Sequence, residues 1–261
     1  LNLTSQIVLK QIPEKYYNPK TAVEASELTR CEKIPTSIHL RPEDGAKRIA
    51  DAIEAEIKAK RAAGKHCVLG LGTGISLNFV FNELIRRHRE EGLSFSNVIV
   101  FNAYEYFPLS EDNIHSSLRQ LSERFLDHVD IDKQNIFSPD SMVAQDMVQD
   151  SCLKYERRIA EVGGIDIMLL GIGRMGNIAS NEPGSVATSA TRLILINDVA
   201  REEMTMSFGS RESVPPCAIT MGVSTILNAR TIYLTAWGEA KADIIRQTVE
   251  SKITDAIPAS F

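Results

Sequence analysis

The sequence predicts an α/β fold, with a single-domain, mostly parallel, doubly wound (Rossmann-like) sheet and helices on both faces. Two observations lead to this fold class. Short apolar runs without polar alternation are typical of strands buried on both sides. Between them lie amphipathic segments with the i, i+3, i+4, i+7 spacing of helices. The 261 residues contain no repeat, low-complexity tract or obvious linker, which favours one domain.

The first segment differs from the rest of the chain. Residues 1–40 contain Pro13, Pro19 and Pro35, which interrupt any long helix, so we expect an extended N-terminal arm that packs on the domain. Residues 41–261 are expected to form the α/β domain itself. Its first element is an amphipathic helix that begins after Pro42 and ends near Gly64.

The remaining elements alternate along the chain. Four apolar runs predict strands, at residues 66–71, 97–102, 165–170 and 232–236. A helix with Ser76 as its cap is expected to run to about Glu91, and another from Glu239 to Glu250. This succession of strands and helices is typical of βαβ units in a parallel sheet.

Composition excludes several classes of function. The net charge of −5 and pI near 5.6 argue against a binder of nucleic-acid phosphates, since Lys and Arg are not in surplus. No apolar run is long enough for a membrane helix. The four cysteines form no CxxC pair, so we expect no metal site, no disulfide framework and a reduced, cytoplasmic protein. No cofactor is expected.

Ligands in parallel α/β folds bind beyond the carboxyl ends of the strands, so the residues there are candidates for a site. Gly72-Thr73-Gly74 follows the first strand, and such a turn before a helix can bind phosphate through backbone N–H groups or serve only as a turn. Lys241 lies at the start of the last helix, where a cation is slightly unfavourable. Its position indicates an anionic partner, although a solvated lysine explains it equally simply.

Three motifs stand in order at these strand ends: FNAYEY at 101–106, GIGRMGNIASNEP at 171–183 and GEAKA at 238–242. Together with Thr191-Arg192 and Val214-Pro215, they resemble the glucosamine-6-phosphate deaminase/isomerase family, which is related to the 6-phosphogluconolactonases. The similarity runs from about residue 40 to the end. It implies the Rossmann-like fold, a hexose phosphate or amino-sugar phosphate as ligand, a homo-oligomer and, in some bacterial relatives, a further C-terminal hydrolase domain or partner.

The acid–base positions depart from the family pattern. The family motif FNMDEY has a carboxylate where this chain has Tyr104, and a tyrosine with a pKa of about 10 is a poor base at neutral pH. The family's Asp-Gly-His becomes Met175-Gly176-Asn177, and neither new side chain can carry a proton near neutral pH. Glu182 of the Asn-Glu-Pro triplet is kept, and Glu105 stands beside Tyr104 on the opposite side of an extended segment.

The phosphate-handling positions are largely kept, in Gly72, Thr73, Gly74 and Lys241. The family's arginine beyond the Asn-Glu-Pro triplet falls at Met206, for which Arg201 or Arg211 could substitute. We therefore predict a sugar-phosphate binder of amino-sugar metabolism with lost or much reduced deaminase activity, which leaves open whether it is an enzyme.

Three alternatives remain open. One is an altered sugar-phosphate isomerase or hydrolase that uses Glu182, with Glu105 or Tyr104. Another is an oligomerisation or docking module for a C-terminal partner domain. In the third, the glycines serve only the turns, and Glu182 and Lys241 have structural or solvated roles.

Overall fold

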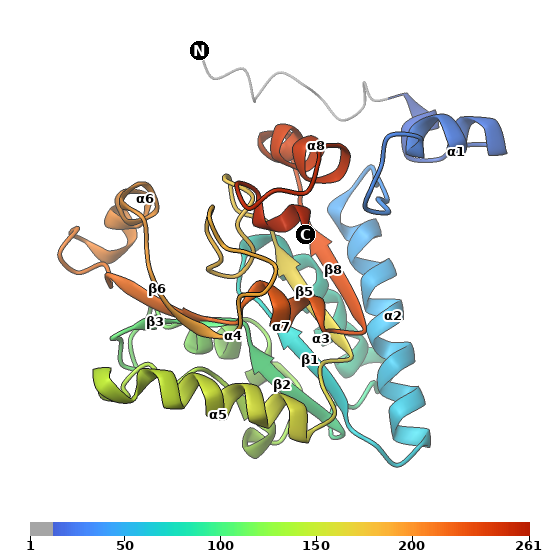
Figure 1. The fold of residues 1–261 in the computed structure, drawn as a ribbon. Helices are drawn as coiled ribbons and strands as arrows, with labels where there is room; N and C mark the ends of the chain where they lie inside the picture. Colours follow the sequence, from blue (N-terminus) through green and yellow to red (C-terminus); the bar gives the residue numbers. More distant parts are fainter. Residues whose placement is uncertain (1–12) are drawn as a thin grey trace.

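The computed structural model describes residues 13–261, and its centre is a five-stranded parallel sheet in the order β4-β2-β1-β5-β8 (Figure 1). The central strand β1 pairs with β2 from Cys67↔Val98 to Leu71↔Asn102 and with β5 at Leu69↔Ile167. The strands of this sheet are β1 (Cys67–Leu71), β2 (Val98–Asn102), β4 (Ile136–Phe137), β5 (Ile167–Gly171) and β8 (Thr231–Thr235).

Successive residues of β1 face opposite sides of the sheet, as the pleat requires, and every one of them is buried. Leu69 belongs to a core that α2 (Pro42–Ala62), α3 (Asn78–Glu91) and α4 (Ser117–Arg124) cover. Val68 belongs to the core on the other face, beneath α5 (Val148–Glu161), α7 (Val223–Leu227) and α8 (Ala242–Glu250). Burial on both faces explains why these strands read as unbroken apolar runs.

A second, three-stranded antiparallel sheet lies beside the first, in the order β3-β7-β6. Its strands are β3 (Tyr104–Phe107), β6 (Arg192–Leu195) and β7 (Cys217–Thr220). β3 follows β2 after a single residue, so the second sheet continues from the carboxyl end of the first (Figure 1). Helix α6 (Asp198–Phe208) joins β6 to β7 and lies at the outer end of this sheet (Figure 1).

The predicted fold class is confirmed, and the predicted strands agree with β1, β2, β5 and β8 to within two residues at either end. The helices predicted from Pro42, Ser76 and Glu239 are present as α2, α3 and α8, with short 3-10 turns before the last two. The three strands of the antiparallel sheet were not predicted.

The N-terminal segment differs from the extended arm that the prolines predicted. It contains helix α1 (Ala22–Thr29), which begins with a capping box: the Thr21 hydroxyl accepts a hydrogen bond from Glu24 N, and the Glu24 carboxylate accepts one from Thr21 N. This local motif outweighs the neighbouring prolines. Lys33 N donates to the Val249 carbonyl at 2.8 Å, which ties the end of the segment to α8. Residues 1–12 of the expected arm lie outside the described residues.

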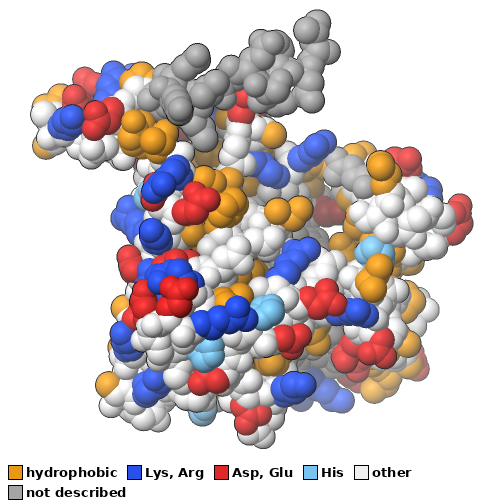
Figure 2. All heavy atoms as spheres, turned by 180° about the vertical axis from the view of Figure 1, so that it is seen from behind, with side chains coloured by type: hydrophobic (Ala, Val, Ile, Leu, Met, Phe, Trp, Pro, Cys, Tyr) orange, Lys and Arg blue, Asp and Glu red, His pale blue; other side chains and the backbone are white. Residues whose placement is uncertain are grey.

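The surface carries no broad region of one charge on the face drawn in Figure 2, where acidic and basic side chains alternate. Between residues 13 and 261, no helix is both long and apolar enough to cross a membrane.

Candidate functional site

The loop after β1 is held by contacts from three other elements. Gly72 N donates to the Leu169 carbonyl of β5 at 2.9 Å. The Thr73 side chain is buried, and its hydroxyl oxygen lies 2.9 Å from the Tyr104 hydroxyl and 3.2 Å from Ser117 Oγ. The Thr73 carbonyl accepts from the Arg124 guanidinium at 2.9 Å. Any ligand that uses the Thr73 hydroxyl must therefore share it with Tyr104.

Ser76 does not cap the following helix as predicted. Helix α3 has Leu77 at its N-cap position and no side-chain capping bond. The Ser76 hydroxyl instead accepts from Thr235 Oγ1 of β8 at 2.9 Å, and its carbonyl accepts from Trp237 Nε1 at 2.7 Å. Ser76 thus joins the ends of β1 and β8, a role that sequence spacing does not reveal because it depends on strand order.

Lys241 reaches the same edge of the sheet from the 3-10 turn Glu239–Lys241. Its Nζ donates to the Ile172 carbonyl at 2.8 Å, directly after β5. β5 is the hydrogen-bonded neighbour of β1, and a Cβ on Gly171 would lie 4.0 Å from the Gly74 Cα. Gly72, Thr73 and Gly74, which were predicted to bind phosphate, thus follow β1, and the Lys241 side chain reaches from the turn after β8 to the end of the neighbouring strand β5.

Tyr104 and Glu105 point to opposite sides of β3, as the strand pleat predicts. The Tyr104 hydroxyl contacts Thr73, whereas the Glu105 carboxylate is 1% exposed and lies at the start of α4. Its oxygens accept hydrogen bonds from Ser116 Oγ at 2.8 Å and from Ser117 N and Leu118 N at 2.8 and 2.9 Å. A carboxylate at a helix N-terminus is stabilising. These contacts favour an anchoring role for Glu105 over proton transfer.

Tyr106 is the next residue on the Tyr104 side of β3, and the two rings meet edge to face with centroids 5.7 Å apart. The neighbouring Tyr104 and burial hold the pKa of Tyr106 well above its ordinary value. Tyr106 therefore remains a neutral phenol at physiological pH and offers no base in place of the missing carboxylate.

The loop after β5 carries the replaced positions Met175 and Asn177. The Met175 side chain is 44% exposed. Asn177 carries a neutral amide, which cannot transfer a proton at ordinary pH. Gly176 between them has φ of +75°, and a Cβ there would lie 2.5 Å from Ile257 Cγ2. The turn therefore needs glycine at 176 for its backbone conformation and for its packing against the C-terminal segment.

Glu182 lies beyond this loop, half-buried, with its carboxylate oxygens 3.1 and 3.3 Å from Asn197 N. Asn197 in turn caps α6 through a bond from Ala200 N to its side chain. Over residues 13–261, no hydrogen bond joins Glu182 to Tyr104 or Asn177. The structure thus brings Tyr104 to the Thr73 loop and holds Glu182 at the start of α6.

The sequence did not predict that Arg192 binds residues on either side of Glu182 in the Asn-Glu-Pro segment. Arg192 is half-buried, and its guanidinium donates to Asn181 Oδ1 and to Ser185 Oγ, both at 2.9 Å. Burial lowers the pKa of Arg192 from its ordinary value, which still leaves it charged at neutral pH. In the sequence, Thr191-Arg192 contributes only to the family resemblance. The short distance along the chain from the Asn-Glu-Pro triplet to Arg192 is the signal that could have predicted this contact.

The arginine substitutes considered for Met206 have partners near α6. Met206 itself is 94% exposed. Arg201 donates to the Val214 carbonyl at 3.3 Å, and Arg211 pairs with Glu202 at 3.1 Å. These contacts hold both guanidinium groups within the segment between β6 and β7.

Residues 41–261 match the family model described as glucosamine-6-phosphate isomerases/6-phosphogluconolactonase. The chain is 38% identical over 218 residues to a glucosamine-6-phosphate deaminase of Bacillus velezensis, a match that covers 84% of this chain and 88% of the relative. A monomeric glucosamine-6-phosphate deaminase of known structure superposes with a TM-score of 0.78 at 36% identity, covering 84% of this chain and 89% of that one.

A longer relative is more similar in sequence. The chain is 56% identical over 260 residues to a protein of Bacteroides thetaiotaomicron described as a putative glucosamine-6-phosphate deaminase-like protein. That match covers all of this chain but only 39% of the relative. A 6-phosphogluconolactonase from Trypanosoma brucei shares the fold alone, with a TM-score of 0.68 at 17% identity over 87% of this chain and 93% of that one.

Proposed function

Because the chain belongs to the glucosamine-6-phosphate isomerase/6-phosphogluconolactonase family, we propose that it binds a hexose phosphate or amino-sugar phosphate with lost or much reduced deaminase activity. The observation that carries this proposal is the contact between the Tyr104 and Thr73 hydroxyls at 2.9 Å. A phenol stands where the family pattern has a carboxylate, and it is hydrogen-bonded to the loop that would take the phosphate.

Phosphate capture is supported by groups that this edge of the sheet retains. The Gly72–Gly74 loop precedes α3, whose N-terminus favours negative charge. Lys241 contributes a cation from the turn after β8, beside the Ile172 carbonyl. The ligand's phosphate would therefore lie between the ends of β1 and β5, with its sugar directed toward Tyr104.

Deamination of an amino-sugar phosphate needs a base that moves a proton from C2 and a group that opens the sugar ring. Tyr104, Met175 and Asn177 do not supply either at neutral pH. A positioned acid or base contributes about 10²–10⁴-fold to a rate, and such groups act as a unit. The loss of three of them accounts for a much lower turnover without loss of binding.

The first experiment compares ammonia release from glucosamine 6-phosphate by the unaltered chain and by a variant carrying Tyr104→Asp, Met175→Asp and Asn177→His. We expect no turnover above background from the first and measurable turnover from the second. Clear turnover by the unaltered chain would contradict the proposal, because another group would then have to supply the base.

Binding is measured separately by calorimetry with glucosamine 6-phosphate and fructose 6-phosphate. We expect Lys241→Gln to weaken binding about tenfold, as for the loss of one charge-assisted hydrogen bond. Lys252→Gln, at an exposed position, is the matched control and should leave affinity unchanged. No heat with either ligand would refute the binding function.

A second candidate function is an altered isomerase or hydrolase that uses Glu182. It is supported by the half-buried carboxylate, which accepts only from the backbone of Asn197 among the described residues. If any turnover of a sugar phosphate is found, Glu182→Gln should abolish it, and an unchanged rate would exclude this role. A homo-oligomer and a C-terminal partner domain stay predictions, which light scattering of the chain with and without such a domain can test.

A further inference from the structure

Trp237 is the one tryptophan of the chain and follows the end of β8 by two residues. Its indole Nε1 donates to the Ser76 carbonyl at 2.7 Å. Its ring meets the Phe79 ring of α3 edge to face, with centroids 6.1 Å apart. One side chain therefore connects the last strand of the parallel sheet to the start of α3.

Gly45 of α2 makes room for this indole. It is buried near the start of a helix, where glycine is less favourable than alanine. A Cβ on Gly45 would lie 2.7 Å from Cη2 and 3.1 Å from Cζ3 of Trp237, which are atoms of the six-membered ring. The backbone of Gly45 is helical, so the close approach of the indole, rather than a special conformation, explains the glycine.

The turn that Trp237 contacts carries two free backbone donors. Ser76 lies in the 3-10 turn Ile75–Leu77, which joins the Gly72–Gly74 loop to α3. In the described part of the chain, the N–H groups of Ile75 and Ser76 donate to no carbonyl or side chain, as is usual for the first N–H groups of a helix. Such groups bind anions. They are therefore candidate donors to the ligand's phosphate.

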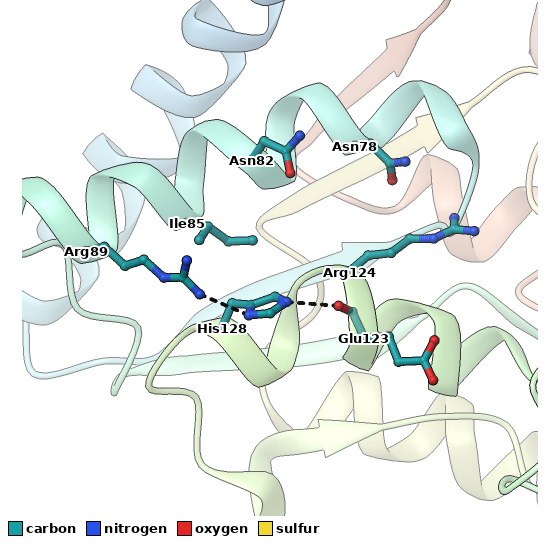
Figure 3. A pocket seen from close by; sticks show the side chains of 7 residues that line it. All are labelled: Asn78, Asn82, Ile85, Arg89, Glu123, Arg124 and His128. Atoms are coloured by element: carbon teal, nitrogen blue, oxygen red, sulfur yellow. Dashed lines mark hydrogen bonds between the residues drawn. The ribbon is translucent and has the colours of Figure 1, made fainter.

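Side chains from two other elements hold this turn at both ends. Arg124 extends from α4 to the start of α3 and donates to the Thr73 carbonyl at 2.9 Å (Figure 3). Trp237 holds the Ser76 carbonyl. Because a peptide unit is planar, these two bonds orient the whole unit after Thr73 and the whole unit after Ser76. The two units between them carry the N–H groups of Ile75 and Ser76.

We propose that Trp237, which lies against Gly45, is a positioning residue of the phosphate loop. It keeps the N–H groups of Ile75 and Ser76 directed toward the ligand's phosphate, and it acts through the Ser76 carbonyl without contacting the ligand. A ligand that binds these N–H groups in turn changes the surroundings of the indole. This role depends on the proposed hexose-phosphate site.

Trp237 itself reports the effect, because its fluorescence is the only tryptophan signal of the chain. Glucosamine 6-phosphate or fructose 6-phosphate should change the emission saturably, with the Kd that calorimetry gives. Trp237→Phe keeps an aromatic ring but loses the N–H donor, and should raise the calorimetric Kd about fivefold, as for one hydrogen bond.

Gly45→Ala perturbs the same contact from the other side. It should raise the Kd by a similar factor and move the emission to longer wavelengths, because the new Cβ displaces the indole toward water. Alanine favours a helix more than glycine does, so the weaker binding cannot result from a weakened α2. In the Trp237→Phe background, Gly45→Ala should add less than about twofold, since the phenyl ring lacks the atoms that meet the Cβ.

Ser141→Ala is the control for a general loss of stability. It removes a bond of the same kind between two other loops, from Ser141 Oγ to the Leu109 carbonyl at 2.6 Å. It should lower the urea midpoint but change the Kd less than about twofold. An equal rise in Kd with Ser141→Ala would overturn the positioning role, because the effect would then be one of stability.

The remaining outcomes separate this role from the proposed function. If the chain binds either ligand but Trp237→Phe and Gly45→Ala leave the Kd unchanged, the positioning role is wrong and the proposed function stands. The same holds if the bound ligand leaves the emission unaltered. No heat with either ligand would remove the hexose-phosphate site, and the positioning role with it.

Discussion

Replacing Glu105 by glutamine should destabilise the protein by about 3 kcal/mol, because the carboxylate anchors α4. Its two oxygens accept four hydrogen bonds, and a glutamine would turn an N–H group toward one backbone N–H of the helix start. Hydrogen bonds to a charged group contribute about 1.5–3 kcal/mol each. The loss of negative charge at the helix N-terminus adds about 0.3–1 kcal/mol.

Urea unfolding followed by circular dichroism measures this change, with Glu111→Gln as the control at an exposed position ahead of the same helix. We expect a clear fall in the midpoint for Glu105→Gln and none for the control. A loss below about 0.5 kcal/mol would refute the anchoring role, since that is within the range of ordinary surface substitutions. Glu105 would then again be a candidate for acid–base chemistry beside Tyr104.

Two further predictions concern titration and thiol reactivity. Hydrogen bonds from Arg86 lower the pKa of Glu83 from 4.5 to about 2, so its stabilising contribution is complete above pH 4.5 and is lost as the pH falls toward 2. In urea unfolding, the native chain should therefore lose about 2 kcal/mol more than Glu83→Gln between pH 5 and 2.5, and equal losses would contradict this. Burial raises the pKa of the Cys67 thiol to about 12, whereas Cys31 is exposed. A thiol reagent at neutral pH should label Cys31 in the folded protein and Cys67 only after unfolding; labelling of folded Cys67 would count against its burial.

The parallel sheet was predictable because burial on both faces leaves a simple signal. Val68 and Leu69 face the cores on opposite sides of the sheet. Successive residues of β1 are therefore all apolar, and the strand is visible in the sequence as an uninterrupted apolar run. The antiparallel sheet leaves a weaker signal. β6 contains the short apolar run Leu193-Ile194-Leu195, but it has no buried residue and Leu195 is 77% exposed, so the run does not correspond to a strand buried on both faces.

The sequence predicted which residues lie at the candidate site, but it did not predict what several of them contact. Alternation along a strand was enough to expect that Tyr104 and Glu105 diverge, and they do. What Glu105 binds depends on where α4 begins, which is fixed by tertiary packing. Likewise, the contacts of Trp237 with Gly45 and Ser76 join segments that are far apart in the sequence, and no spacing rule connects them.

Two neighbouring residues of β3 therefore have independent tasks. The Tyr104 hydroxyl contacts Thr73 in the loop after β1 and its ring packs against Tyr106, while Glu105 holds the start of α4 on the other side of the strand. A substitution at 104 therefore acts first on the loop after β1, whereas one at 105 acts first on the start of α4.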